Sequence, residues 1–141
     1  MISNISHITF IVKNLEHASF FLKKIFEAEE VYSSGDNTFS LSREKFFLIG
    51  DIWICIMEGE PLLERSYNHI AFKIDERDID DYIARIKGVG AEIRPERKRI
   101  GGEGRSVYFY DFNNHLFELH SGTLTERLAT YSYQIAAIKE D

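Results

Sequence analysis

The sequence predicts an α+β fold made of two tandem βαβββ modules. The first observation is a repeated start, because Ser6–Val12 (SHITFIV) recurs 62 residues later as Asn68–Ile74 (NHIAFKI). The second is that the same offset pairs Phe20 with Tyr82 further along the chain. The third is the order of segments after each start, where one stretch of helical periodicity precedes several short stretches of strand character. Together these observations indicate an internal duplication.

The first module covers about residues 1–58. We expect a strand over about Ile5 to Val12, followed by a helix that begins after the polar cap Asn14. The helix is amphipathic, because apolar residues recur in it at spacings of three and four. Short strands then follow at Glu29–Ser33, Thr38–Ser42, Phe46–Ile49 and Ile52–Glu58, separated by turns rich in Gly, Asn and Asp.

The second module covers about residues 67–122 and repeats this order. A strand over Asn68–Ile74 leads to a helix that begins after Asp75. The later strands are expected at Ala91–Arg94, Ser106–Asp111 and His115–His120. Glu58–Ser66 is the predicted linker, and the modules form one domain over residues 1–141. The tail Tyr133–Asp141 is expected to be a short helix or a disordered end.

The composition is typical of a globular cytoplasmic protein. At 141 residues and 44% apolar content, the chain is long enough to bury a real core. No apolar run approaches the ~20 residues of a membrane span, and the start Met-Ile-Ser-Asn-Ile lacks the features of a signal peptide. The single cysteine, Cys55, permits no intrachain disulfide, which fits a reducing compartment. We therefore expect a cytoplasmic protein without a membrane partner.

The charge distribution argues against nucleic acid as a partner. The net charge is -6, whereas binding to a phosphate backbone needs a positive surface. One segment is locally basic, because Arg94 to Arg105 contains five Lys or Arg residues and only two Glu residues. Such a cluster is either a solvated loop or an anion pocket, and both interpretations remain open at this point.

A candidate metal site follows from the duplication. His7 and His69 occupy the same place in the two modules. Glu118 lies inside the apolar run Leu-Phe-Glu-Leu, where a carboxylate is costly to bury without a cation or hydrogen-bond donors. Two His and one Glu form a facial metal site with open positions. His115 and His120 compete for the ligand role, and His120 is the stronger rival because strand parity puts it on the face of Glu118.

Six segments then carry a family resemblance that covers nearly the whole chain up to about Ser132. The chain resembles the vicinal-oxygen-chelate superfamily and, within it, the FosX epoxide hydrolases among the fosfomycin-resistance proteins. The segments are Ser6–Thr9, Tyr32–Asp36, Phe39–Ile49, Trp53–Glu58, Tyr67–Phe72 and Gly102–Asp111.

The resemblance implies a metal site, a dimer and a substrate pocket. It assigns His7, His69 and Glu118 to the metal, which is usually Mn2+ in this family. It also implies a homodimer with exchanged modules, in which His7 of one copy meets His69 and Glu118 of the other. The phosphonate pocket maps onto Thr9, Tyr67, Lys98, Ser106, Tyr108 and Arg127.

Glu44 separates the possible reactions. By itself, Arg43-Glu44-Lys45 has the composition of a charged surface turn. The resemblance instead implies that Glu44 is a general base that activates water, so we expect Mn2+-dependent hydrolysis of the fosfomycin epoxide to a vicinal diol. The alternatives are a thiol transferase with the same metal, a drug-binding protein without catalysis and, on the metal ligands alone, an iron dioxygenase.

Overall fold

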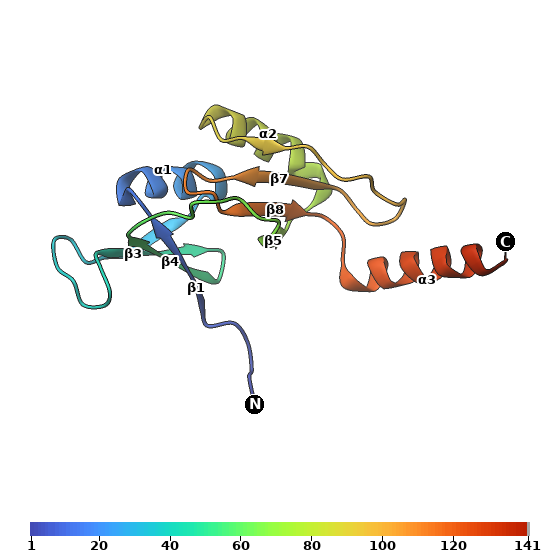
Figure 1. The fold of residues 1–141 in the computed structure, drawn as a ribbon, viewed down its shortest axis with the longest axis horizontal. Coiled ribbons are helices and arrows are strands. Elements are labelled where there is room, and N and C mark those ends of the chain that lie inside the picture. The colour runs from blue at the N-terminus through green and yellow to red at the C-terminus, as the bar shows by residue number, and fades with distance from the viewer. Residues whose placement is uncertain (141) are drawn as a thin grey trace.

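The computed structural model describes residues 1–140 and contains two four-stranded sheets with associated helices (Figure 1). The order βαβββ occurs twice, as the sequence predicts. The first module contains β1 (His7–Val12), α1 (Leu15–Phe26), β2 (Glu29–Ser33), β3 (Glu44–Ile49) and β4 (Ile52–Glu58). The second contains β5 (His69–Lys73), the 3-10 helix η1 (Glu76–Asp78), α2 (Ile79–Gly88), β6 (Ile93–Arg94), β7 (Ser106–Tyr110) and β8 (Leu116–His120), and α3 (Leu124–Glu140) follows.

Both sheets have the same topology. The strand orders are β1-β4-β3-β2 and β5-β8-β7-β6. The pairs β1–β4 and β5–β8 are parallel, and the other pairs are antiparallel. Strands β1 and β5 therefore each pair on one side only and leave an open edge, which is a template for pairing with another chain.

One apolar core joins the two modules. Helix α1 begins at a cap in which the Asn14 side chain accepts a hydrogen bond from the His17 amide at 2.9 Å. Its apolar face packs with residues of both sheets, since Phe21 contacts Phe109 and Phe117 of the second module. The core residues come from both sheets and both helices, and they include Val12, Ile25, Phe47, Ile54, Phe72, Ile86, Phe109 and Phe117. Each sheet thus packs one face in this core, while β7 and most of β8 are buried on the outer face as well.

The predicted strand at Thr38–Ser42 is wrong. This segment is irregular and lies in the connection between β2 and β3, which pair directly with each other. The segment alternates apolar and polar residues, but no neighbouring strand pairs with it. Phe39 and Leu41 therefore remain 74% and 81% exposed. The surface-turn interpretation of Glu44 is also wrong, because Glu44 begins β3 and is only 8% exposed.

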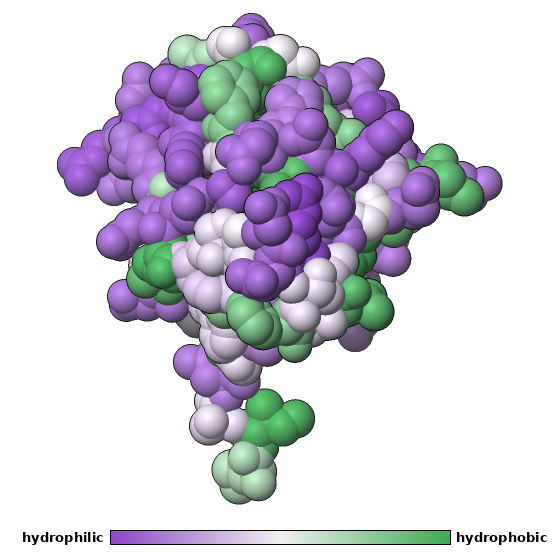
Figure 2. Space-filling model, turned by 90° about the vertical axis from the view of Figure 1, so that its left-hand side faces the viewer, coloured by the Kyte–Doolittle hydropathy of each residue, from purple (hydrophilic) through white to green (hydrophobic). Residues whose placement is uncertain are grey.

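The C-terminal tail is helical as far as Glu140, while Asp141 lies outside the described residues. Helix α3 extends away from the two sheets at one end of the molecule (Figure 1). The opposite end, viewed in Figure 2, has a mainly hydrophilic surface with small apolar patches. Across residues 1–140, the structure contains no helix with the length and apolar character needed to cross a membrane.

Candidate functional site

The outer face of the second sheet collects the polar side chains of β5, β7 and β8. The register places Ala71 and Tyr108 on either side of Glu118. Because side chains alternate along a strand, His69 and Ser106 share this face, while Phe109, Phe117 and Leu119 enter the core. A carboxylate, a hydroxyl and an imidazole therefore converge on one surface of the sheet.

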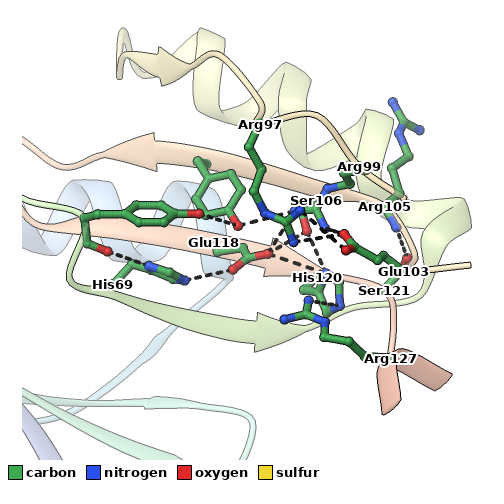
Figure 3. Close-up of polar contacts among 12 residues, drawn as sticks. His69, Arg97, Arg99, Glu103, Arg105, Ser106, Glu118, His120, Ser121 and Arg127 are labelled. Carbon is green, nitrogen blue, oxygen red and sulfur yellow. Dashed lines mark hydrogen bonds and ion pairs between the residues drawn. The ribbon is translucent and has the colours of Figure 1, made fainter. Parts of the chain in front are cut away.

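His69 and Glu118 form the geometric centre of this face. Their Nε2 and Oε1 atoms lie 3.0 Å apart, and Glu118 is only 4% exposed (Figure 3). The His69 Nδ1 atom lies 2.7 Å from the Tyr67 carbonyl oxygen, which can only accept a hydrogen bond, so Nδ1 carries the hydrogen. In the neutral ring, Nε2 then directs a lone pair at a carboxylate oxygen. Because both atoms then offer lone pairs, a proton or a metal ion must lie between them. An imidazole nitrogen and a carboxylate oxygen are ligands that suit a divalent cation.

A directional chain of hydrogen bonds supports Glu118 from behind (Figure 3). The Ser106 hydroxyl donates to Glu118 at 2.6 Å and accepts from His120 Nδ1 at 2.6 Å. The other nitrogen of His120 accepts from the Arg127 guanidinium at 3.1 Å. Burial lowers the pKa of His120, and the nearby charges of Arg127 and Arg99 lower it further. His120 thus orients Ser106 and Glu118, while only His69 points at the outer oxygen of the carboxylate.

Arg99 is a site residue that the sequence analysis did not single out. Its guanidinium lies 3.3 Å from the Tyr108 hydroxyl and 3.5 Å from Glu118, and its side chain is 12% exposed. Lys98, which the resemblance places in the pocket, is exposed. The contact with the buried Glu103 at 3.4 Å holds the Arg99 side chain inside. The local sequence carries no signal that distinguishes Arg99 from Lys98.

A buried carboxylate fixes the basic segment against α3. Glu103 is 1% exposed and contacts Arg97 at 2.9 Å, Arg99 at 3.4 Å and the Tyr131 hydroxyl at 2.5 Å. Burial by itself would raise the pKa of Glu103, but the hydrogen bonds from Tyr131 and Arg97 outweigh it and hold the pKa below its ordinary value. The basic cluster is therefore partly a folded network rather than a solvated loop.

Two tyrosines complete this face. The Tyr67 and Tyr108 hydroxyls are 3.2 Å apart, and the Arg94 guanidinium lies 4.8 Å from the centre of the Tyr67 ring. Burial and the hydrogen bond with Tyr67 raise the pKa of Tyr108 to about 12. Tyr108 therefore keeps its proton at neutral pH and can donate to an anion. A hollow lined by Tyr67, Arg94, Arg97 and Tyr108 opens beside them.

The outer face of the first sheet carries the remaining predicted residues. The register aligns His7 with Trp53 and Thr9 with Cys55. The Cys55 thiol lies 3.7 Å from the Glu44 carboxylate, and burial together with that negative charge raises the pKa of Cys55 to about 11. Cys55 occupies the place that Glu118 holds in the second sheet, as expected from the duplication.

The predicted metal ligands divide between the two faces. His69 and Glu118 meet, whereas the contacts of His7 are with Ser6 at 3.0 Å and with the Trp53 ring. Within residues 1–140 of one chain, no three His, Cys, Asp or Glu side chains form a group able to hold a metal. Glu44 and Thr9 lie on the face of His7. One chain therefore presents two partial sites.

Comparison with known proteins gives this arrangement a family. The chain matches the Glyoxalase/Bleomycin resistance protein/Dioxygenase superfamily over residues 4–119. It is 68% identical to the fosfomycin resistance protein FosX of Listeria innocua, over 93% of this chain and 98% of that protein. The chain belongs to the FosX family. The chain is also similar to a solved structure of a FosX variant from Listeria monocytogenes, which is complexed with Mn(II) and 1S,2S-dihydroxypropylphosphonic acid. The two sequences are 60% identical and the TM-score is 0.86, over 93% of this chain and 99% of that one.

A second group of relatives is more distant than FosX. The metallothiol transferase FosB of Shouchella clausii is 40% identical over 93% of this chain and 88% of that protein. The FosX family and FosB therefore share a fold and much of their sequence. The higher identity to FosX separates this chain from the thiol transferases.

Proposed function

We propose that this FosX-family chain hydrolyses the epoxide of fosfomycin to a vicinal diol, with Mn2+ as its cofactor, in the cytoplasm. The observation that carries the proposal is 68% identity to a FosX over almost the whole length of both chains. A solved FosX binds Mn(II) and a propylphosphonic acid with hydroxyls on neighbouring carbons, the product that water addition to an epoxypropylphosphonate gives. The pairing of His69 with Glu118 in this chain supplies two fitting metal ligands.

His69, Glu118 and a His7 would hold the metal ion. The Tyr67 carbonyl fixes the His69 ring with Nε2 free to bind, and Ser106 orients the carboxylate of Glu118. When bound, Mn2+ supplies Lewis-acid stabilisation of the negative charge that develops on the epoxide oxygen, an effect of several kcal/mol. The residues around it need only position the substrate and move one proton.

Donors around this centre would bind the phosphonate. Arg127 and Arg99 supply guanidinium groups, which recognise phosphonate oxygens with paired N–H donors, and the exposed Lys98 would add a further positive charge. The hydroxyl groups that would add hydrogen bonds are those of Thr9, Tyr67, Ser106 and Tyr108. Because Tyr108 keeps its proton at neutral pH, it can donate to the anion.

Glu44 would act as the general base. Its carboxylate takes a proton from water as the water oxygen bonds to the carbon that bears phosphorus. The bond between that carbon and the epoxide oxygen breaks, the released oxygen takes a proton from solvent to complete the diol, and Glu44 returns its proton to solvent. Buried placement at the start of β3 supports this role, since few charged groups compete for its lone pairs.

The complete site requires two copies of the chain. We propose a homodimer in which His7, Thr9 and Glu44 of one copy face His69 and Glu118 of the other. The division of these residues between two faces of one chain supports this arrangement. The open edges of β1 and β5 offer the surface for pairing.

Phosphorus NMR tests the reaction. Purified protein with fosfomycin and Mn2+, without thiol, is expected to give the diol. The same sample without metal serves as the control, and a second sample contains glutathione. A product that forms only in the presence of thiol would contradict the hydrolase and favour the transferase chemistry named for FosB. Binding without any product would favour a sequestering protein.

Complementation between inactive variants tests the shared site. His7→Ala and Glu118→Ala copies are each expected to be inactive alone. A mixed dimer contains one intact site, with His7 from the second variant and His69 and Glu118 from the first, so refolding a 1:1 mixture should restore about a quarter of full activity. A mixture that stays inactive although mixed dimers form would rule out the shared site.

A further inference from the structure

Arg99 lies between two buried carboxylates, those of Glu103 and Glu118 (Figure 3). Its Nη1 atom is 3.4 Å from Glu103 Oε2, and its Nη2 atom is 3.5 Å from Glu118 Oε2. Both distances exceed the roughly 2.7–2.9 Å that is usual for a hydrogen bond between a guanidinium and a carboxylate. The guanidinium of Arg99 is therefore shared by the two carboxylates and tightly bound to neither.

The two carboxylates differ in their other partners. Glu103 also contacts Arg97 at 2.9 Å and accepts from the Tyr131 hydroxyl at 2.5 Å, so its position is set without Arg99. Burial by itself would raise the pKa of Glu103, but these hydrogen bonds hold it below its ordinary value, and the carboxylate is charged at neutral pH. Glu103 is thus a fixed negative charge beside Arg99, whereas Glu118 is a proposed ligand of the metal ion.

One edge of the Arg99 guanidinium has donors to spare. Within residues 1–140, its buried Nε atom has no hydrogen-bond partner. The contacts of the neighbouring Nη2 atom, with Tyr108 and Glu118, are long at 3.3 Å and 3.5 Å. Nε and Nη2 donate side by side from one edge of the planar group, which is the geometry that binds two oxygens of an anion. A buried donor without an acceptor is costly, and a bound anion would supply the acceptor.

We infer that Glu103 is a positioning residue, which keeps Arg99 from closing on Glu118 and presents the Nε–Nη2 edge of its guanidinium to the phosphonate. This inference rests on the proposed function, in which Glu118 binds Mn2+ and Arg99 meets the substrate. Without the charge of Glu103, the remaining carboxylate in contact with Arg99 is Glu118. A closer pair of Arg99 and Glu118 would compete with the metal ion and turn the edge away from the substrate. Glu103 itself touches neither metal nor substrate.

The affinity for Mn2+ tests the direction of this effect. Glu103→Gln is expected to bind Mn2+ about 10-fold to 100-fold more weakly than wild type, the range typical for groups that act on a metal ligand from outside. Arg99→Met should bind Mn2+ at least as tightly as wild type, because it removes a positive charge beside Glu118. A titration monitored by paramagnetic resonance gives the dissociation constants. Unchanged Mn2+ affinity in Glu103→Gln would overturn the inference.

A double-mutant cycle tests whether Glu103 acts through Arg99. The variant that carries both Glu103→Gln and Arg99→Met should have the Mn2+ affinity of Arg99→Met alone, since no guanidinium is left to close on Glu118. A purely structural role of Glu103 predicts the same loss of affinity with and without Arg99. That additive result would overturn the inference.

Propylphosphonate, which has the phosphonate group but no epoxide, tests the second half of the inference. On protein saturated with Mn2+, calorimetry is expected to find at least about tenfold weaker binding to Glu103→Gln and to Arg99→Met than to wild type, the effect of losing a hydrogen bond to a charged group. Arg99→Lys keeps the charge but lacks the two-donor edge, so it should not restore the affinity. Equal binding to Glu103→Gln and wild type would overturn the inference.

Tyr131→Phe is the matched control for the buried network. It removes one hydrogen bond of Glu103 but leaves the carboxylate and its contact with Arg99. Thermal unfolding should occur at a lower temperature, as in Glu103→Gln, while both dissociation constants stay those of wild type. Affinity losses equal to those of Glu103→Gln would assign the effect to the anchoring of α3 and overturn the inference. Glu96→Gln, which removes an exposed charge of the same segment, should match wild type throughout.

A conservative variant covers the case in which Glu103→Gln does not fold. Glu103→Asp keeps the charge but shortens its reach toward Arg99 by one methylene. It is expected to weaken the binding of Mn2+ and of propylphosphonate in the same direction, and only where Arg99 is present. Unchanged affinities in a folded Glu103→Asp would overturn the inference.

Phosphorus NMR on the same samples separates this inference from the proposed function. Wild-type protein that forms diol, beside a Glu103→Gln variant with unaltered affinities, would overturn the inference and leave the proposed function intact. Wild-type protein that binds Mn2+ and propylphosphonate with the expected differences between variants, but forms no diol, would instead contradict the proposed hydrolysis and support the positioning role.

Discussion

The two sheets of this protein have the same topology and opposite chemistry on their outer faces. At equivalent places on β8 and β4, the second sheet has the carboxylate of Glu118 and the first has the thiol of Cys55. Glu118 is held by Ser106 and Arg99, whereas Cys55 lies beside Glu44 and stays neutral because its pKa is raised to about 11.

Under the proposed function, a duplicated module divides one reaction between its two sheets. The second sheet concentrates the groups that fit a cation and an anion, and the first keeps an isolated carboxylate suited to accept a proton. A carboxylate in place of Cys55 would lie beside Glu44, so the two negative charges would repel and one would protonate. The neutral thiol of Cys55 thus fits the proposed role of Glu44 as a base.

Removing the carboxylate of the second sheet is expected to have the largest effect. Glu118→Ala should lose stoichiometric Mn2+ and reduce turnover by ~10³ or more, because Lewis-acid stabilisation amounts to several kcal/mol and each 1.36 kcal/mol is tenfold in rate. Electron paramagnetic resonance measures the bound metal. Cys55→Ala, the equivalent change in the first sheet, should keep the metal. Full Mn2+ retention by Glu118→Ala would contradict the ligand role.

The second-largest effect on turnover is expected from a change of the carboxylate in the first sheet, Glu44. Glu44→Gln should bind Mn2+ and fosfomycin almost normally but lower turnover by ~10² to 10⁴, the usual range for loss of a general base. Turnover is followed by phosphorus NMR and metal content by mass spectrometry. Glu29→Gln, an exposed carboxylate on β2, is the control. Near-normal turnover of Glu44→Gln would remove Glu44 from the reaction.

The third prediction concerns support of the metal ligand. Ser106→Ala interrupts the chain from Arg127 through His120 to Glu118, so Mn2+ affinity should fall 10-fold to 100-fold, the range typical for groups that orient a metal ligand. A Mn2+ titration monitored by paramagnetic resonance gives the dissociation constant. The exposed Thr125→Ala is expected to match wild type. Equal affinities for all three proteins would show that Ser106 does not orient Glu118.

The smallest effect concerns the thiol of the first sheet. With its pKa raised to about 11, Cys55 should react with iodoacetamide at pH 8 at least ~100-fold more slowly than in the unfolded chain. The folded thiol holds its proton at pH values where the unfolded thiol has lost it, so this contribution to stability falls as pH rises above ~8.5. Mass spectrometry follows the alkylation, and thermal unfolding of Cys55→Ala should lack this part of the pH dependence. Rapid alkylation of the native protein would contradict the burial.

The sequence predicts the fold well because the duplication and the periodicity repeat in both halves. It fails at Thr38–Ser42, where a strand pattern exists but β2 and β3 pair directly and leave no neighbour. No local signal reveals that competition between strands. The exposed Phe39 and Leu41 of this segment are therefore features of the assembled sheet rather than of the local sequence.

The site is predicted less completely than the fold. The sequence analysis selects His69 from the duplication and Glu118 from its apolar surroundings, and the structure brings the two side chains together. Arg99, rather than Lys98, lies inside because it contacts Glu103, four residues later. Glu103 is buried, but the charged sequence around it does not predict that burial. The proposed place of His7 beside the metal involves a second chain, which no local pattern describes.

The shared core has a consequence for how such resistance genes exchange parts. Phe21 of the first module packs against Phe109 and Phe117 of the second, so the two halves share the main core. A recombination event in the linker between the modules would join two halves that must match in volume at this contact, where each mismatched methylene costs about 1 kcal/mol. Selection then favours inheritance of residues 7–120 as a unit.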